Sequence, residues 1–250
     1  MKSNIFLKLL MLGGLALAFT IGAECAFATQ LTNVQLGTPP GPGSFSYDGA
    51  TNSYTLTGQG GLSSVGNQST VSAFGDFAYT AVTGDFSISA VVSSYTTGWA
   101  GILAMNSLNT ADMDAGSFYD GQLAQDAAQY VSSYNGTYQR ATISGTSTGT
   151  WLRLTRSGNV FSEYASVTGS SWSLISSETI PMLNTIYAGL FVDTANYSTT
   201  TTSTSTFSSV SIPATQSGSA SSVTAPATLG LLALSLIGSG LLRKWRKDML

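Results

Sequence analysis

Hydrophobic and polar residues alternate in short runs along the middle of the chain, between residues 29 and 213. These runs are rich in Val, Ile, Tyr and Thr, and turns of Gly, Asn, Asp or Ser separate them. Period-two alternation predicts strands, and many short strands predict an all-β, two-sheet antiparallel sandwich. The candidate strands are Tyr54–Thr57, Phe86–Ser93, Gly101–Met105, Gln129–Tyr134, Arg140–Ser144, Trp151–Arg156, Val160–Ser166, Ser173–Thr179, Ile186–Val192 and Thr206–Ile212.

The segment Trp151–Arg156 gives the clearest strand pattern. Its odd-numbered residues are predicted to face one way and its even-numbered residues the other. Gly158 and Asn159 tolerate the positive φ of a tight turn, so this strand should pair with Val160–Ser166. We expect Trp151 and Trp172 to be core or covering residues.

Other stretches are assigned by composition. Residues 121–130 allow a short helical turn. Residues 198–205 are almost pure Ser and Thr and predict an exposed hairpin tip. Residues 214–224 have the small polar composition of a flexible linker.

The N-terminus has the three parts of a secretory signal peptide. Lys2 and Lys8 precede an apolar run, and Ala26-Phe27-Ala28 supplies a small-residue cleavage site. We place cleavage after Ala28, so residues 1–28 are removed. In the alternative interpretation the chain is a lipoprotein with Cys25 as its lipidated residue.

The C-terminus carries a second apolar segment. Residues 225–242 contain no charge, and basic residues cluster within 243–247. A helix over this run is about 27 Å long, close to the thickness of a bilayer core. It predicts a transmembrane helix whose basic end stays in the cytoplasm.

The exported region lacks most catalytic side chains. The chain contains no histidine, its one cysteine precedes the cleavage site, and residues 29–224 contain no lysine. Serine–histidine, cysteine and lysine nucleophiles are therefore excluded, as are zinc sites. Ten acidic residues against three arginines also argue against nucleic acid as a partner.

Two sets of side chains remain as candidates. Asp112 and Asp114 could bind Ca²⁺ through hard oxygen ligands, or they could form an ordinary solvated acidic loop. Trp99, Tyr134 and Tyr138 could stack against sugar rings, or they could simply cover the sheets. Glu163 and Glu178 do not form the alternating acidic run of a sandwich glycosidase, so no catalytic residues are assigned.

The C-terminal segment resembles the PEP-CTERM protein-sorting signal. The resemblance rests on Val223–Leu229, in which Pro226 is followed by Ala-Thr-Leu, and on the apolar helix and basic tail that come next. It implies that residues 225–250 are a sorting signal read by an exosortase-type enzyme, with processing near Pro226. It also implies a bacterium that makes exopolysaccharide.

The exported region resembles laminin-G/concanavalin A-like (DUF1349-like) jelly-roll modules. The matching segments are 43–49, 74–79, 84–92, 98–105, 151–159, 166–172, 187–190 and 206–210. The resemblance implies a jelly-roll domain over residues 29–213. We expect a non-catalytic surface or matrix protein that contacts extracellular polysaccharide, held at the inner membrane before processing and in the envelope or medium afterwards. The alternatives are a structural or adhesive protein without a glycan ligand, and a glycoside hydrolase-like enzyme.

Overall fold

A computed structural model describes residues 31–61, 74–144, 149–195 and 201–213. The predicted signal peptide, linker, transmembrane helix and sorting signal lie outside the described residues, as do the processing positions Ala28 and Pro226. The described segments form fourteen strands and no helix. Accordingly, none of these segments contains a helix long and apolar enough to cross a membrane.

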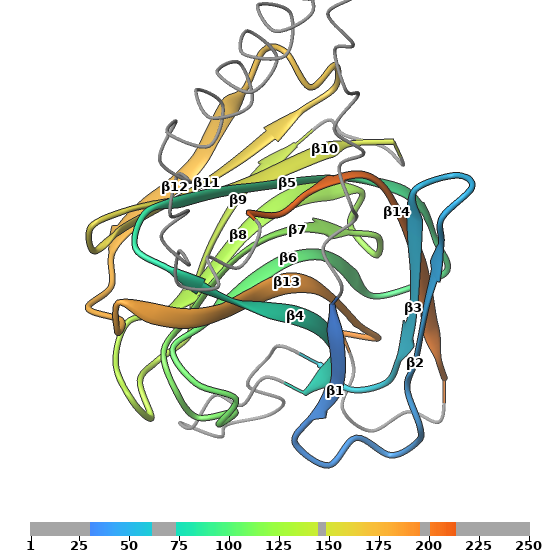
Figure 1. The fold of residues 1–250 in the computed structure, drawn as a ribbon, viewed down its shortest axis with the longest axis horizontal. Coiled ribbons are helices and arrows are strands. Elements are labelled where there is room, and N and C mark those ends of the chain that lie inside the picture. Colours follow the sequence, from blue (N-terminus) through green and yellow to red (C-terminus); the bar gives the residue numbers. More distant parts are fainter. Residues whose placement is uncertain (1–30, 62–73, 145–148, 196–200, 214–250) are drawn as a thin grey trace, which may run out of the picture.

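The strands form two sheets of seven, stacked face to face (Figure 1). Sheet A contains, in spatial order, β1 (Thr32–Leu36), β4 (Gly75–Thr83), β13 (Thr185–Asp193), β6 (Trp99–Met105), β7 (Asp114–Asp120), β8 (Gln125–Val131) and β9 (Gln139–Ser144). Sheet B contains β12 (Ser173–Thr179), β11 (Val160–Ser166), β10 (Trp151–Ser157), β5 (Phe86–Tyr95), β14 (Ser203–Ser211), β3 (Ser53–Gly58) and β2 (Ser44–Asp48).

Every neighbouring pair of strands is antiparallel, and the two sheets make a jelly-roll sandwich. β2, β3 and β14 run down one side of the sandwich in Figure 1. The main core lies between the sheets, because alternate side chains of both sheets point inward. Its fully buried members include Leu56, Ile88, Ile102, Leu154, Phe161, Leu190 and Phe207.

The strongest sequence predictions are confirmed. Trp151–Arg156 alternates between half-buried and buried residues as expected, and it pairs with β11 through a turn in which Gly158 has φ 60°. β11 and β12 have the predicted bounds. Trp151 is only half-buried on the outer face of sheet B, so it is a covering residue and not a core residue.

The acidic region was predicted correctly only in part: Asp112 lies in a loop, but the strand that begins at Asp114 was missed. Asp114–Asp120 is not a loop but β7, and the helical turn expected over 121–130 is mostly β8. β7 contains no β-branched residue, so propensity gives little sign of it. The ring of Phe118 lies over Gly116, where an added Cβ would come within 2.3 Å of it, and this packing makes a glycine acceptable inside the strand.

Three further boundaries differ from the predictions. β8 ends at Val131, because the chain turns at Asn135, which has φ 52°. The Ser/Thr run is not all a hairpin tip: Ser203 and Ser205 belong to β14 and are fully buried, while 196–200 lie outside the described residues. β1 was missed although Val34 and Leu36 alternate with Asn33 and Gln35, and the candidate strands also omitted β2 and β4.

Candidate functional site

Trp99 lies on the outer face of sheet A, where it begins β6. Its residue exposure is 5%, and its ring contacts Phe118 on one side and the Arg140 guanidinium on the other. The arginine Cζ is 4.6 Å from the ring centroid. Trp99 therefore anchors a second apolar cluster and offers no free ring face to a sugar.

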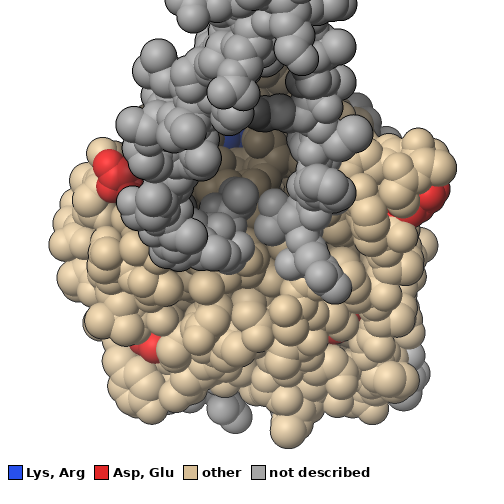
Figure 2. Space-filling model, in the orientation of Figure 1, with Lys and Arg blue, Asp and Glu red and all other residues tan. Residues whose placement is uncertain are grey.

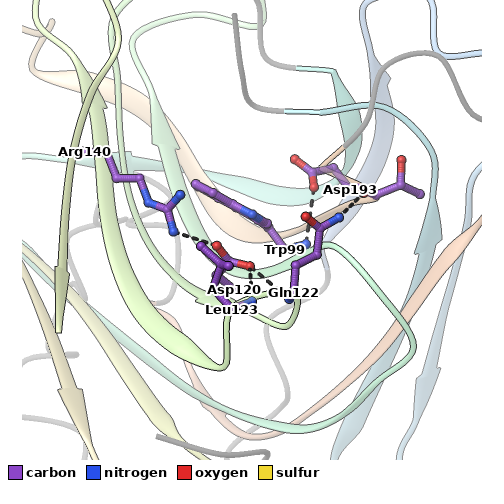
Figure 3. Close-up of polar contacts among 7 residues, drawn as sticks. Trp99, Asp120, Gln122, Leu123, Arg140 and Asp193 are labelled. Atoms are coloured by element: carbon purple, nitrogen blue, oxygen red, sulfur yellow. Dashed lines mark hydrogen bonds and ion pairs between the residues drawn. The ribbon is translucent and has the colours of Figure 1, made fainter. Parts of the chain in front are cut away.

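Polar contacts fix the surroundings of Trp99 (Figure 3). Arg140 on β9 donates to Asp120 at the end of β7, with 2.6 Å between Nη2 and Oδ2. The other Asp120 oxygen accepts the backbone N–H groups of Gln122 and Leu123. Asp193 on β13 accepts the backbone N–H of Trp99 at 3.3 Å. This arrangement joins four strands and is characteristic of a structural cluster.

The structure places the two candidate tyrosines in different environments. Tyr138 packs on the same outer-face cluster as Trp99, and burial raises the pKa of its hydroxyl. Tyr134 is 60% exposed at the neighbouring turn and takes no part in the cluster. The structure therefore brings Trp99 and Tyr138 together, but not as a pair of open stacking surfaces.

Asp112 and Asp114 have different environments. The Asp112 carboxylate accepts hydrogen bonds from Asn106, Ser107 and the Met113 backbone, at 2.6–3.2 Å. Asp114 is buried on the outer face of sheet A, and burial raises its pKa to about 8. Among the described residues no group of three potential metal-binding side chains occurs. Calcium binding stays a prediction, and calorimetric titration of the wild type and of the double Asp→Asn variant would test it.

The remaining acids differ in their spacing and burial. Asp114 and Asp120 share one face of β7 but are six residues, roughly 20 Å, apart along the strand. Paired glycosidase carboxylates stand only about 5–10 Å apart. Glu163 points between the sheets with neither carboxylate oxygen hydrogen-bonded, and burial raises its pKa to about 8.

A different cluster occupies the outer face of sheet B. The Arg153 guanidinium lies between the rings of Tyr164 and Trp172, with its Cζ 4.5 Å and 4.2 Å from their centroids. Trp151 meets Trp172 edge to face at 6.5 Å. All four residues are half-buried, so they are packed yet still reach the surface. We call Trp151, Arg153, Tyr164 and Trp172 the arginine–aromatic platform.

Hydroxyl groups surround the platform. In the register, Arg153 is opposite Ser89, and Thr155 is opposite Ser87 on β5 and Ser162 on β11. The hydroxyls of Ser162 and Ser177 are 2.8 Å apart. The side of the molecule turned to the viewer in Figure 2 is mostly uncharged, with a few separate acidic spots. The hydroxyl groups next to the platform can hydrogen-bond a polyhydroxylated ligand.

The sequence indicated only part of this platform. Alternation places Trp151 and Arg153 on one face, but their contacts with Tyr164 and Trp172 depend on how three strands are aligned. That alignment includes a β-bulge between Glu163 and Tyr164 in the pairing of β11 with β12. An arginine flanked by aromatic residues on successive predicted strands was the available signal.

Neither a scan against protein-family models nor a search of curated proteins finds a match. Solved jelly-roll sandwiches do resemble the chain. A functionally unknown protein from Saccharomyces cerevisiae is 18% identical over 74% of this chain and 96% of its own, with a TM-score of 0.54. Carbohydrate-binding module CBM66 from Bacillus subtilis is 12% identical over 73% and 94%, with a TM-score of 0.44. A glycoside hydrolase family 16 endo-glucanase from Bacteroides ovatus is 12% identical over 72% and 94%, also with a TM-score of 0.44. At these identities the likeness shows the fold alone.

Proposed function

We propose that this chain is an exported, non-catalytic surface or matrix protein that contacts extracellular polysaccharide through the arginine–aromatic platform. The observation that carries the proposal is the half-exposed stack of Tyr164, Arg153 and Trp172 on a hydroxyl-rich sheet face. Aromatic edges contact the C–H surfaces of sugars, and arginine and hydroxyl groups hydrogen-bond their oxygens.

The non-catalytic part of the proposal is supported by the placement of the acids. Asp120 is held by Arg140, Glu163 faces the interior, and Asp114 is isolated on its strand. The chain contains no histidine that could replace them as a proton carrier.

Affinity electrophoresis of the full-length chain in gels containing soluble polysaccharides tests the contact. We expect retardation by at least one polymer, and Trp172→Ala should abolish it. Trp99→Phe is the matched control, because it alters a tryptophan on the other sheet and should leave retardation intact. No retardation by any polymer would favour the structural or adhesive alternative. Release of reducing sugar from a bound polymer would instead show a hydrolase.

The proposal includes export and tethering by the chain ends. The motivation is the sequence of residues 1–28 and 225–247, with its two apolar runs and basic flanks. Fractionation of cells, with the C-terminal mass of the mature protein, would test it. Processing near Pro226 predicts a soluble envelope form, and an unprocessed tail predicts a membrane form. Recovery of the domain from the cytoplasm would contradict both.

A further inference from the structure

The described residues include three arginines and no lysine, and the three arginines differ sharply in their partners. Arg140 is paired with the Asp120 carboxylate. Arg156 is buried and donates to the backbone carbonyls of Gly158, Met182 and Asn184. Arg153 makes no hydrogen bond or ion pair with any described residue, and its buried Nε has no acceptor.

The Arg153 guanidinium is nevertheless held in place. The rings of Tyr164 and Trp172, whose centroids are 4.5 Å and 4.2 Å from Cζ, restrict its rotation while leaving its N–H donors unused. The two ring contacts hold the guanidinium, and no described residue accepts a hydrogen bond from it. A guanidinium held in one orientation can donate two parallel hydrogen bonds to a carboxylate or sulfate with little loss of side-chain entropy.

The distribution of charged residues around Arg153 favours binding of an anionic ligand at its guanidinium. By the strand register, no carboxylate lies on the outer face of β5, β10, β11 or β12. The two acids on these strands point inward: Glu163 is fully buried, and Glu178 is opposite the buried Phe161. Neutral hydroxyls are the polar neighbours, so a charged ligand at Arg153 meets no competing carboxylate there.

We propose that the platform recognises acidic polysaccharide, with one sugar carboxylate or sulfate bound at the Arg153 guanidinium. This inference rests on the proposed function and adds the chemical class of the glycan. The aromatic rings set the position of the guanidinium, and the surrounding hydroxyls contact the sugar hydroxyl groups.

Matched polymers test the inference on the full-length chain. Polygalacturonate is compared with its methyl ester, and alginate with its propylene glycol ester, because each pair shares a backbone and differs in free carboxylate. Wild type should bind the free acids at least about tenfold more tightly than the esters, the scale of one bidentate charged contact. Added salt should weaken binding of the acids alone.

Two charge-conserving variants complete the design. Arg153→Lys keeps the positive charge but loses the planar guanidinium with its paired N–H donors. It should weaken binding of the acidic polysaccharides by about tenfold. Arg140→Lys is the matched control, because Arg140 also stacks on a tryptophan but is already paired, and it should stay within about twofold of wild type. If Arg153→Lys does not fold, as judged by its melting curve, the ester and salt comparisons on wild type decide the question.

The outcomes separate the two proposals. Equal affinity for acids and esters, together with loss of both in Trp172→Ala, would retain the polysaccharide contact and overturn the acidic class. Unchanged binding by a folded Arg153→Lys would overturn it as well. Absence of binding to every polymer would overturn both proposals.

Discussion

Glu163 gives the stability of this protein an unusual pH dependence. Its side chain is fully buried between the sheets, and burial raises its pKa from 4.5 to about 8. Between these two values the folded chain holds a proton that the unfolded chain releases. The contribution of Glu163 to the free energy of unfolding is therefore fully present below pH 4.5 and is lost as the pH rises toward 8.

The magnitude follows from the size of the shift. Each pKa unit corresponds to about 1.4 kcal/mol, so the rise from 4.5 to about 8 costs about 5 kcal/mol by pH 8. Glu163→Gln keeps the shape and stays neutral at every pH. We expect it to match wild type near pH 4.5 and to be more stable by several kcal/mol at pH 8.

Urea denaturation followed by tryptophan fluorescence at pH 4.5, 6 and 8 measures this difference. Subtracting the variant curve from wild type removes the contributions of other buried acids, such as Asp76 and Asp114. Glu178→Gln makes the same chemical change at a half-buried position on β12. Because the Glu178 charge contributes to raising the Glu163 pKa, this variant should be slightly more stable at pH 8, by less than about 1 kcal/mol. A Glu163→Gln variant that is no more stable than wild type at pH 8 would refute the reasoning, since the carboxylate would then ionise without cost.

Two further predictions concern turns and the ion pair. Gly169 has φ +74°, and a Cβ there would lie 2.7 Å from the Trp151 ring, whereas Gly158 has φ +60° with open space around it. Gly169→Ala should therefore cost about 2–3 kcal/mol in thermal unfolding and Gly158→Ala only about 1, and equal costs would show that the ring moves freely. Asp120→Ala removes the partner of Arg140 and the oxygen that accepts two backbone N–H groups, and it should cost about 2–4 kcal/mol. Asp120→Asn retains a side-chain oxygen that can accept these two hydrogen bonds and should cost about half as much. Identical unfolding midpoints for these two variants would show that the backbone bonds contribute nothing.

Local signals explain which parts of the fold were predictable. The hairpin at Gly158 and the alternation of β10 depend on a few adjacent residues, so they can be predicted from the sequence alone. β7 could not be recognised from the sequence, because five of its seven residues are small or acidic and it is stabilised by neighbours on both sides in the sheet. Tertiary context overrides weak strand propensity there.

The candidate sites, like β7, depend on contacts between strands that the sequence does not show. The cluster around the first candidate joins three strands, which carry Trp99, Asp120 and Arg140. Only the alignment of these strands shows that Arg140, paired with Asp120, stacks on the tryptophan ring and makes it inaccessible to a ligand. Conversely, nothing local to Arg153 shows that it has no partner. That property depends on the direction of every acid in the neighbouring strands, which the sheet register determines.

Among the described residues each sheet ends in edge strands, and exposed edge strands affect solubility. Edge strands are often protected by lysine, which residues 29–224 do not contain. β12, an edge of sheet B, has other protection: a bulge disrupts its pairing with β11, Glu178 adds charge, and Pro181 follows its end. At high protein concentration these features would keep β12 from pairing with the sheets of neighbouring molecules.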